Sequence, residues 1–215
     1  MPKTLTLRDG SALVLRSPEV ADAEALLERL DRVRRESTGI SLDPGDDLPT
    51  LEWERRWIEE RRSARGVQIL AIADDGEIAG MCGCSPGSTI RSRHRANLGI
   101  SLTAAWCGRG LGTALMAELI AWAEADEEIE VLCLCVNADN PRAIHVYEKV
   151  GFVREGERRW GTKRGDLYIG EVQMSRWVGR GPEPPSATDS PVLTVCGGFL
   201  SARFEPADRI SGKRK

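Results

Sequence analysis

The chain has 215 residues, of which 41% are hydrophobic and 29% are charged, and its formal net charge is −3 at pH 7. This length suits one domain with a sizeable core, and the slightly acidic balance argues against a nucleic-acid-binding surface. The first residues lack the apolar stretch of a secretory signal, and no apolar run approaches a membrane span. We therefore expect a cytoplasmic protein.

The first part of the sequence predicts a hairpin followed by two helices. Residues 5–15 suggest a strand or hairpin, and Ser17 followed by Pro18 predicts the beginning of a helix. An acidic loop is expected over residues 34–49, and a second helix over residues 51–62. The later segments with strand-like patterns are residues 68–73, 77–84, 97–102, 130–136, 152–159 and 168–177.

A glycine-rich turn, residues 106–113, lies between the predicted strand 97–102 and a run of helix formers, residues 114–123. Glycine lets a backbone approach a ligand closely, and the first turn of a helix offers unpaired N–H groups and a positive dipole end. The turn therefore predicts a cradle for a diphosphate, with an ordinary tight connection as the alternative. It lacks the Gly-Lys-Ser/Thr of a P-loop and the glycine spacing of a dinucleotide fingerprint.

A second motif consists of Asn140, Ala143, Tyr147, Gly151 and Phe152. Together with the glycine turn it resembles the GNAT superfamily of acetyl-CoA-dependent N-acetyltransferases, where Gln/Arg-x-x-Gly-x-Gly/Ala precedes Asn-x-x-Ala-x-x-x-Tyr-x-x-x-Gly-Phe. One position departs, because the first residue of the glycine motif is a cysteine here, which puts one polar contact with the cofactor in question.

The resemblance covers about residues 5–178. It implies an α/β fold with a mixed, mostly antiparallel sheet, splayed parallel strands and flanking helices. We assign residues 1–178 to the acetyltransferase domain. Residues 179–215 form a Pro/Gly-rich tail that we expect to be flexible, with a short strand around Val192 as the alternative.

The resemblance also implies that acetyl-CoA is the acyl donor and that no metal takes part. The backbone of the splayed strand would face the pantetheine arm and bind the acyl carbonyl, while the glycine turn would hold the diphosphate. Asn140 either contacts the cofactor or only caps its helix. The expected cofactor-binding residues are Ile100, Ser101, Leu102, Cys107, Gly108, Arg109, Gly110, Leu111, Gly112, Thr113, Asn140 and Tyr147.

Three residues are catalytic candidates. Tyr147 is the expected general acid, although full transfer from a phenol of pKa near 10 to a thiolate of pKa near 8.5 is uphill by about 2 kcal/mol. The alternative is a tyrosine packed in the core. Asn97 stands where many relatives carry a glutamate, so it could orient a water or the amine but not accept a proton. His94 has a suitable intrinsic pKa, but a surface histidine near a basic loop is the interpretation we favour.

The predicted reaction is transfer of an acetyl group to a primary amine of a small molecule such as an amino acid. The alternatives are acetylation of protein N-termini, ribosomal proteins included, and a non-catalytic acyl-CoA sensor. The expected partner is thus a small amine or a peptide N-terminus, without nucleic acid or membrane, and a homodimer stays open. The acidic loop either attracts the amine or has no role.

Four of the six cysteines form two pairs, Cys82 with Cys84 and Cys133 with Cys135. Each pair lies within a predicted strand and faces one side of it. A metal site of four thiolates is one interpretation, but structural zinc sites usually take Cys-x-x-Cys turns. Buried thiols are the interpretation we favour.

Overall fold

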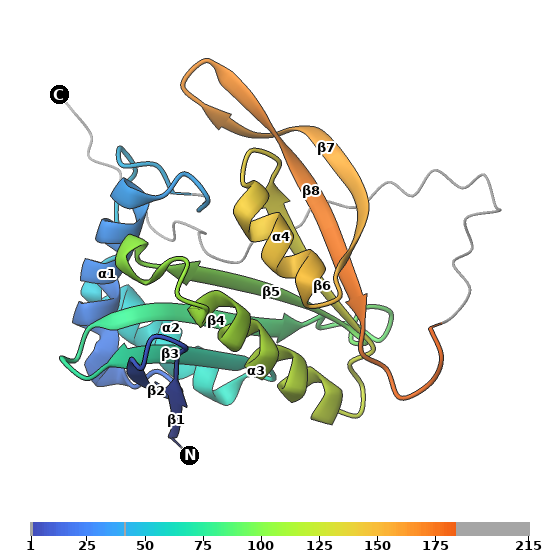
Figure 1. The fold of residues 1–215 in the computed structure, drawn as a ribbon, viewed down its shortest axis with the longest axis horizontal. Helices are drawn as coiled ribbons and strands as arrows, with labels where there is room; N and C mark the ends of the chain where they lie inside the picture. The colour runs from blue at the N-terminus through green and yellow to red at the C-terminus, as the bar shows by residue number, and fades with distance from the viewer. Residues whose placement is uncertain (1, 41, 184–215) are drawn as a thin grey trace, which may run out of the picture. The chain divides into compact units, whose positions relative to one another are not determined.

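The computed structural model describes residues 2–40 and 42–183. They form one eight-stranded sheet in the order β1-β2-β3-β4-β5-β6-β8-β7 (Figure 1). The strands are β1 (Lys3–Thr6), β2 (Ala12–Arg16), β3 (Val67–Ala73), β4 (Ile78–Pro86), β5 (Arg95–Leu102), β6 (Val131–Asn137), β7 (Val153–Arg164) and β8 (Leu167–Trp177). The α-helices are α1 (Ala23–Glu36), α2 (Leu51–Ser63), α3 (Leu111–Ala125) and α4 (Pro141–Lys149).

The predicted fold class is confirmed. The neighbouring strands pair antiparallel except for β5 and β6, which are parallel. Helices α3 and α4 lie on one face of the sheet, and α1 and α2 lie on the other (Figure 1). A parallel pair needs a crossover connection, and here α3 supplies it.

The first helix begins later than the sequence predicted. Its expected start at Ser17 and Pro18 is wrong, because a 3₁₀ turn over Val20–Asp22 comes first and α1 follows from Ala23. The Glu19 N–H donates to Asp22 Oδ2 over 2.7 Å, so Asp22 closes this turn. The serine and proline therefore predicted correctly that a helix follows, but they did not predict the residue at which it begins.

Two hydrophobic clusters hold the helices to the sheet. The larger contains the buried face of α3, including Leu115 and Leu119, and Ile144 of α4. The smaller packs α1 and α2 against the opposite face through residues such as Leu26 and Ile58. Each sheet face is therefore covered by its own helix pair. A ligand that reaches the middle of the sheet would enter where two neighbouring strands separate.

Such a gap exists between β5 and β6. Strand β5 pairs with β4 from Ala96 to Leu102, but with β6 only at Arg95, Ala96 and Asn97. Beyond Asn97 the two strands diverge, as Figure 1 shows, and β6 continues its pairing with β8. The second half of β5 therefore has one open backbone edge.

The tail lies almost wholly outside the described residues. Residues 179–183 contain no helix or strand. The strand expected around Val192 falls in residues 184–215 and is not described. Among the described helices, none combines the length and the apolar character needed to cross a membrane.

Candidate functional site

The glycine turn between β5 and α3 has the backbone geometry of an anion cradle. Gly108 and Gly110 have φ angles of 83° and 93°, in the left-handed region that glycine adopts at no cost. Gly110 is the N-cap of α3, and the first helical bond runs from the N–H of Ala114 to its carbonyl over 3.1 Å. The N–H groups of residues 108–113 donate to no other described residue, so they are available to an anion at the helix start.

The direction of the β5 backbone follows from two hydrogen bonds to its neighbour β4. Gly87 N–H donates to the carbonyl of Arg95 over 2.9 Å, and Thr103 N–H donates to the carbonyl of Ala79 over 3.0 Å. Backbone groups alternate in direction along a strand, and the register shows no shift between these two bonds. The odd-numbered residues of β5 thus direct their N–H and C=O groups to β4.

The even-numbered residues direct theirs to the opposite side. At the start of the strand this is visible directly, because the N–H of Val131 in β6 donates to the carbonyl of His94 over 3.1 Å. Beyond the last paired position, Asn97, the N–H groups of Ile100 and Leu102 therefore face the gap between β5 and β6. These two predicted residues present donors to the gap, whereas the backbone groups of Ser101 face β4.

Tyr147 lies on α4, whose start is fixed by Asn140. Asn140 Oδ1 accepts a hydrogen bond from the N–H of Ala143 over 3.1 Å, so its capping role is present. Tyr147 follows two turns later and is 9% exposed, with its ring centroid 6.2 Å from that of Phe152. Burial raises the pKa of Tyr147 to about 12. The phenol is thus a neutral hydrogen-bond donor at any physiological pH.

Comparison with known proteins identifies this combination. The sequence profile of the acetyltransferase (GNAT) family matches residues 28–152. The chain belongs to the GNAT family and is an N-acetyltransferase.

Individual relatives agree with this assignment. A GNAT acetyltransferase structure from Streptococcus pneumoniae is 32% identical, with a TM-score of 0.73, and the match covers 78% of this chain and 99% of that one. The L-amino acid N-acetyltransferase AaaT of Escherichia coli is 28% identical over 77% of this chain and 98% of its own length. The fold is shared with a GNAT phosphinothricin acetyltransferase from Sinorhizobium meliloti in complex with acetyl-CoA, at 18% identity, a TM-score of 0.69, and coverage of 82% and 94%.

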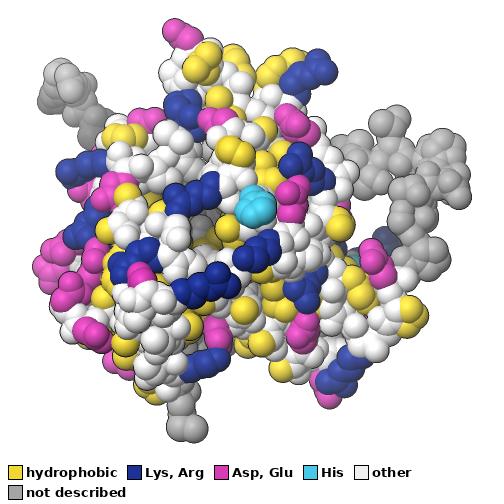
Figure 2. Space-filling view, viewed as in Figure 1, with side chains coloured by type: hydrophobic (Ala, Val, Ile, Leu, Met, Phe, Trp, Pro, Cys, Tyr) yellow, Lys and Arg dark blue, Asp and Glu magenta, His cyan; other side chains and the backbone are white. Residues whose placement is uncertain are grey.

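The two arginines near the GNAT glycine turn differ in their surroundings. Arg109 Nε pairs with Asp9 Oδ2 over 2.6 Å, and its guanidinium lies 4.1 Å from the ring centroid of Trp106. Arg109 therefore braces the turn against the β1–β2 loop. Arg142 of α4 reaches over the turn, because a Cβ built on Gly108 would lie 2.6 Å from Arg142 Nη2. Figure 2 shows a hollow beside α4 on this face, with Lys and Arg side chains around its rim.

The remaining cofactor-binding candidates lie in the turn itself. Cys107 is half-buried just before the glycines. The side chain of Leu111 is fully buried, so only its backbone is available to a ligand. A Cβ on Gly112 would contact Leu102 Cδ1 at 3.5 Å, and Thr113 follows in the first turn of α3. The N–H groups of Leu111, Gly112 and Thr113 are open backbone donors, whereas the Cys107 N–H donates to the carbonyl of Ala104 over 3.1 Å.

The other sheet face, toward α1 and α2, offers room beside β5. Asn97 and Gly99 direct their side-chain positions to this face, because Ser101 of the same parity contacts Arg29 of α1 there. Gly99 is exposed, and a Cβ built on it would meet nothing within 4 Å. His94 precedes the strand and lies about 20 Å along it from Ile100. Asn97 therefore borders the open half of β5, and His94 does not.

The cysteine pairs project from opposite faces of the sheet. Cys84 pairs in register with Leu98, whereas Cys133 pairs with Asn97, and successive residues of a strand face opposite sides. One ion could not be held by both pairs. In the part of the chain that the structure describes, no three His, Cys, Asp or Glu side chains are grouped for a metal. The expectation of buried thiols is wrong for Cys135, which is exposed.

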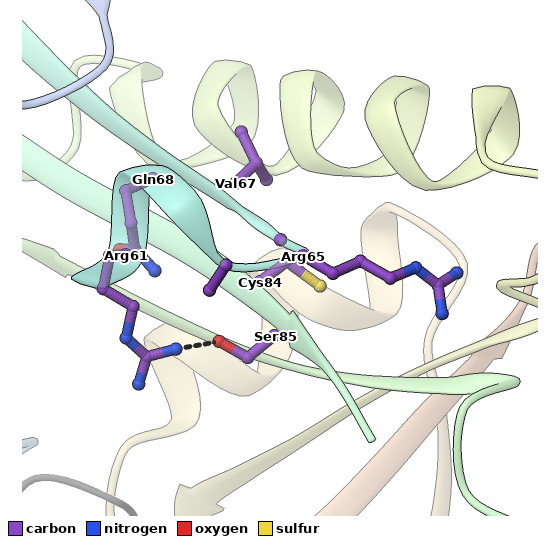
Figure 3. Close-up of a pocket in the computed structure, with 8 residues that line it drawn as sticks. Arg61, Arg65, Val67, Gln68, Cys84 and Ser85 are labelled. Atoms are coloured by element: carbon purple, nitrogen blue, oxygen red, sulfur yellow. Dashed lines mark hydrogen bonds between the residues drawn. The ribbon is translucent and has the colours of Figure 1, made fainter. Parts of the chain in front are cut away.

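A small hollow at the end of α2 lies apart from these residues (Figure 3). Arg61 donates to Ser85 Oγ across it, and Arg65 extends away from it to pair with Asp126 over 2.6 Å. A Cβ on Gly66 would come within 2.6 Å of the carbonyl oxygen of Cys84. Since its arginines are committed to internal partners, this hollow offers no free group for catalysis.

Sequence reasoning missed three polar residues that connect α1, and the residue Thr38 beyond its end, to the sheet. Arg29 of α1 is buried and donates to Ser101. Asn137 Nδ2, at the end of β6, and Arg164 Nη2, at the end of β7, each donate to the carbonyl of Thr38 over 3.0 Å. An asparagine closing the apolar run of β6 was a usable signal, but nothing in the sequence of α1 distinguished Arg29 from its neighbours.

Proposed function

We propose that this GNAT enzyme transfers the acetyl group of acetyl-CoA to the primary amine of a small molecule such as an amino acid. The observation that carries the proposal is the divergence of β5 and β6 beyond Asn97. It leaves the N–H groups of Ile100 and Leu102 facing a gap, a few residues before the unpaired N–H groups of residues 108–113. The first set suits a thioester carbonyl and the second a diphosphate.

The donor residues fit acetyl-CoA by shape as well as by charge. The left-handed backbone at Gly108 and Gly110 lets the turn approach the diphosphate closely, and Arg142 offers a cation beside Gly108. Within residues 2–40 and 42–183, Arg142 has no carboxylate within ion-pair distance, unlike Arg109. We therefore assign phosphate contact to Arg142 and a bracing role to Arg109. Acetyl-CoA, when bound, supplies the activated acetyl group.

In this proposal the chain's own groups have separate roles in acetyl transfer, which for Tyr147 rest on the family motif that contains it. The N–H groups of Ile100 and Leu102 would stabilise negative charge that develops on the acetyl oxygen. Tyr147 would donate a hydrogen bond to the departing sulfur. With a pKa of about 12, complete transfer of its proton to a thiolate of pKa near 8.5 is uphill by about 5 kcal/mol. Its contribution is therefore a hydrogen bond to the sulfur rather than an early proton transfer.

The acceptor amine must be neutral to attack, and no carboxylate is placed on β5 to deprotonate it. Asn97 borders the open half of the strand and could orient the amine or a water through its amide. His94 is left out of the proposed machinery because of its distance along the strand. The rate should then follow the neutral fraction of the amine.

The resemblance to an L-amino acid N-acetyltransferase supports an amino acid as the acceptor. The open space over Gly99, on the face away from α3, is where we place it. Asn97 and Ser101 border this space along β5, so the walls that this strand provides are polar. Such walls suit a small polar amine better than a lipid-like one.

Two measurements test the proposal. Calorimetry with acetyl-CoA should show binding to the full chain, and release of free thiol should be stimulated by amino acids more than by N-terminal peptides, including ribosomal-protein sequences. Absence of binding heat would refute the donor site. Binding without thiol release above hydrolysis would favour a sensor, and preference for peptides would replace the amino acid with a protein N-terminus.

A further inference from the structure

A buried arginine of α1 contacts β5 from the sheet face that α1 and α2 cover. Arg29 is 6% exposed. Its Nη2 donates to the carbonyl oxygen of Ser101 over 2.6 Å and to Ser101 Oγ over 3.0 Å. A charged donor makes a hydrogen bond about twice as strong as a neutral one. The contact therefore puts a strong electrostatic restraint on one peptide group of β5.

That peptide group connects the arginine with the gap. The carbonyl of Ser101 and the N–H of Leu102 belong to the same peptide unit, which is planar, and the described residues contain no cis peptide. In a trans peptide the two groups point in opposite directions. Since the Ser101 carbonyl faces β4, the Leu102 N–H faces the gap between β5 and β6.

We propose that Arg29 is a positioning residue for acetyl transfer: its charge polarises the Ser101–Leu102 peptide and fixes the Leu102 N–H as the donor to the acetyl oxygen. The inference rests on the proposed function. A cation on the carbonyl draws electron density away from the amide nitrogen, so the N–H becomes a stronger donor. The same bond keeps the peptide from rotating, which preorganises the donor before the acetyl group arrives.

Loss of Arg29 should lower kcat by less than the complete loss of an oxyanion donor would. Removal of one oxyanion donor lowers kcat by about 100- to 1,000-fold in a well-studied protease. Loss of Arg29 keeps the Leu102 N–H but weakens and loosens it. We therefore expect Arg29→Met to lower kcat about tenfold, with little change in the KM for acetyl-CoA.

The kinetic test uses three variants of the full chain. Arg29→Met removes the charge but keeps an apolar stem of similar length, and Arg29→Lys keeps the charge but loses the fork, so it should fall between wild type and Arg29→Met. The matched control is Arg35→Met on the same helix, because the Arg35 side chain is 65% exposed and pairs with Asp31. Thermal unfolding of each variant separates loss of fold from loss of rate.

A spectroscopic signature separates polarisation from mere packing. Labelling serine carbonyl carbons with ¹³C and leucine nitrogens with ¹⁵N selects the two Ser-Leu steps of the sequence, residues 41–42 and 101–102. The amide proton of Leu102 should move upfield in Arg29→Met, with an intermediate position in Arg29→Lys, while the Leu42 signal serves as the reference.

The outcomes are distinct. An upfield Leu102 signal together with a lower kcat supports the proposal. An unchanged Leu102 signal, or an unchanged kcat despite a shifted signal, overturns it. If wild type binds no acetyl-CoA, the proposed function fails by itself, and the Leu102 signal still reports whether Arg29 polarises the peptide. If Arg29→Met does not fold, the comparison between Arg29→Lys and wild type decides in the same way.

Discussion

Arg142 Nη2 lies 2.6 Å from the position that a Cβ on Gly108 would occupy. A side chain of α4 therefore reaches the turn that begins α3, although the two segments are separated in sequence by α3 and β6. The contact ties both motifs of the sequence to one place. It also means that the two glycines of the turn can be tested against each other.

Alanine at Gly110 should weaken acetyl-CoA binding by about tenfold, because the free turn would relax and binding would have to restore a left-handed φ that costs an L-residue about 1–2 kcal/mol. Its Cβ would meet nothing within 4 Å, so the effect comes from the backbone alone. Alanine at Gly108 carries the same strain and also displaces Arg142, so it should weaken binding further. Calorimetry measures both, and equal affinities for the two variants would remove Arg142 from the site.

Tyr147→Phe should lower kcat by about ten- to a hundredfold, because it removes the donor to the sulfur while keeping the ring. The KM for acetyl-CoA should change little. Since the pKa of Tyr147 is about 12, wild type and variant should show the same pH dependence between pH 6 and pH 10. An alkaline limb of wild-type kcat in this range that vanishes in the variant would contradict the assignment.

The same tyrosine predicts a loss of stability at high pH. Its folded pKa of about 12 exceeds the usual value of 10, so its contribution is intact below pH 10 and is lost as the pH rises toward 12. Between pH 9 and pH 11 wild type should lose about 1.4 kcal/mol of unfolding free energy more than Tyr147→Phe. Urea unfolding at the two pH values checks this, and parallel losses in both proteins would refute it.

A larger side chain at Gly99 should weaken binding of the acceptor amine and leave binding of acetyl-CoA unchanged. We expect Gly99→Leu to raise the KM for the amine by about tenfold and to leave acetyl-CoA affinity unchanged. Gly156→Leu is the matched control, because a Cβ on Gly156 of β7 also meets nothing within 4 Å. Steady-state kinetics with each substrate varied in turn separate the two effects, and a loss of acetyl-CoA affinity in Gly99→Leu would place the space on the donor side.

Thiol modification should report occupancy of the glycine turn. Burial raises the pKa of Cys84 to about 12 and that of Cys82 further, so both should resist iodoacetamide. Cys107 is half-buried and Cys135 is exposed, so both should react. Coenzyme A should slow modification of Cys107 more than that of Cys135, as peptide mass spectrometry can measure. Equal protection at the two residues would argue against binding at the turn.

Local patterns in the sequence predicted most of the fold. The Asp-Gly turn before β4 and the Asn140–Pro141 start of α4 are set by short-range geometry, and the structure has both. The direction of each peptide of β5 depends on its register with β4, which no local pattern encodes. That is why Ser101 was grouped with Ile100 and Leu102, although its backbone faces the other way.

The role of Arg29 could not be predicted for a related reason. It is one of several arginines on an amphipathic helix, and only the packing of α1 over β5 brings it to Ser101. Cys135 likewise lies beyond the three residues of β6 that pair with β5, and no local pattern encodes where that pairing ends. Contacts between distant segments decided each of these cases.

Strand β5 also separates two kinds of evolutionary constraint. In the proposed function its main chain, which any amino acid supplies, binds the acetyl donor, whereas the side chains at positions 97 and 99 face the proposed acceptor on the other face. Mutation at those two positions can therefore alter which amine is accepted without disturbing the grip on the nucleotide. Acceptor specificity could therefore diverge among related enzymes by single substitutions on one face of β5, while acetyl-CoA binding is retained.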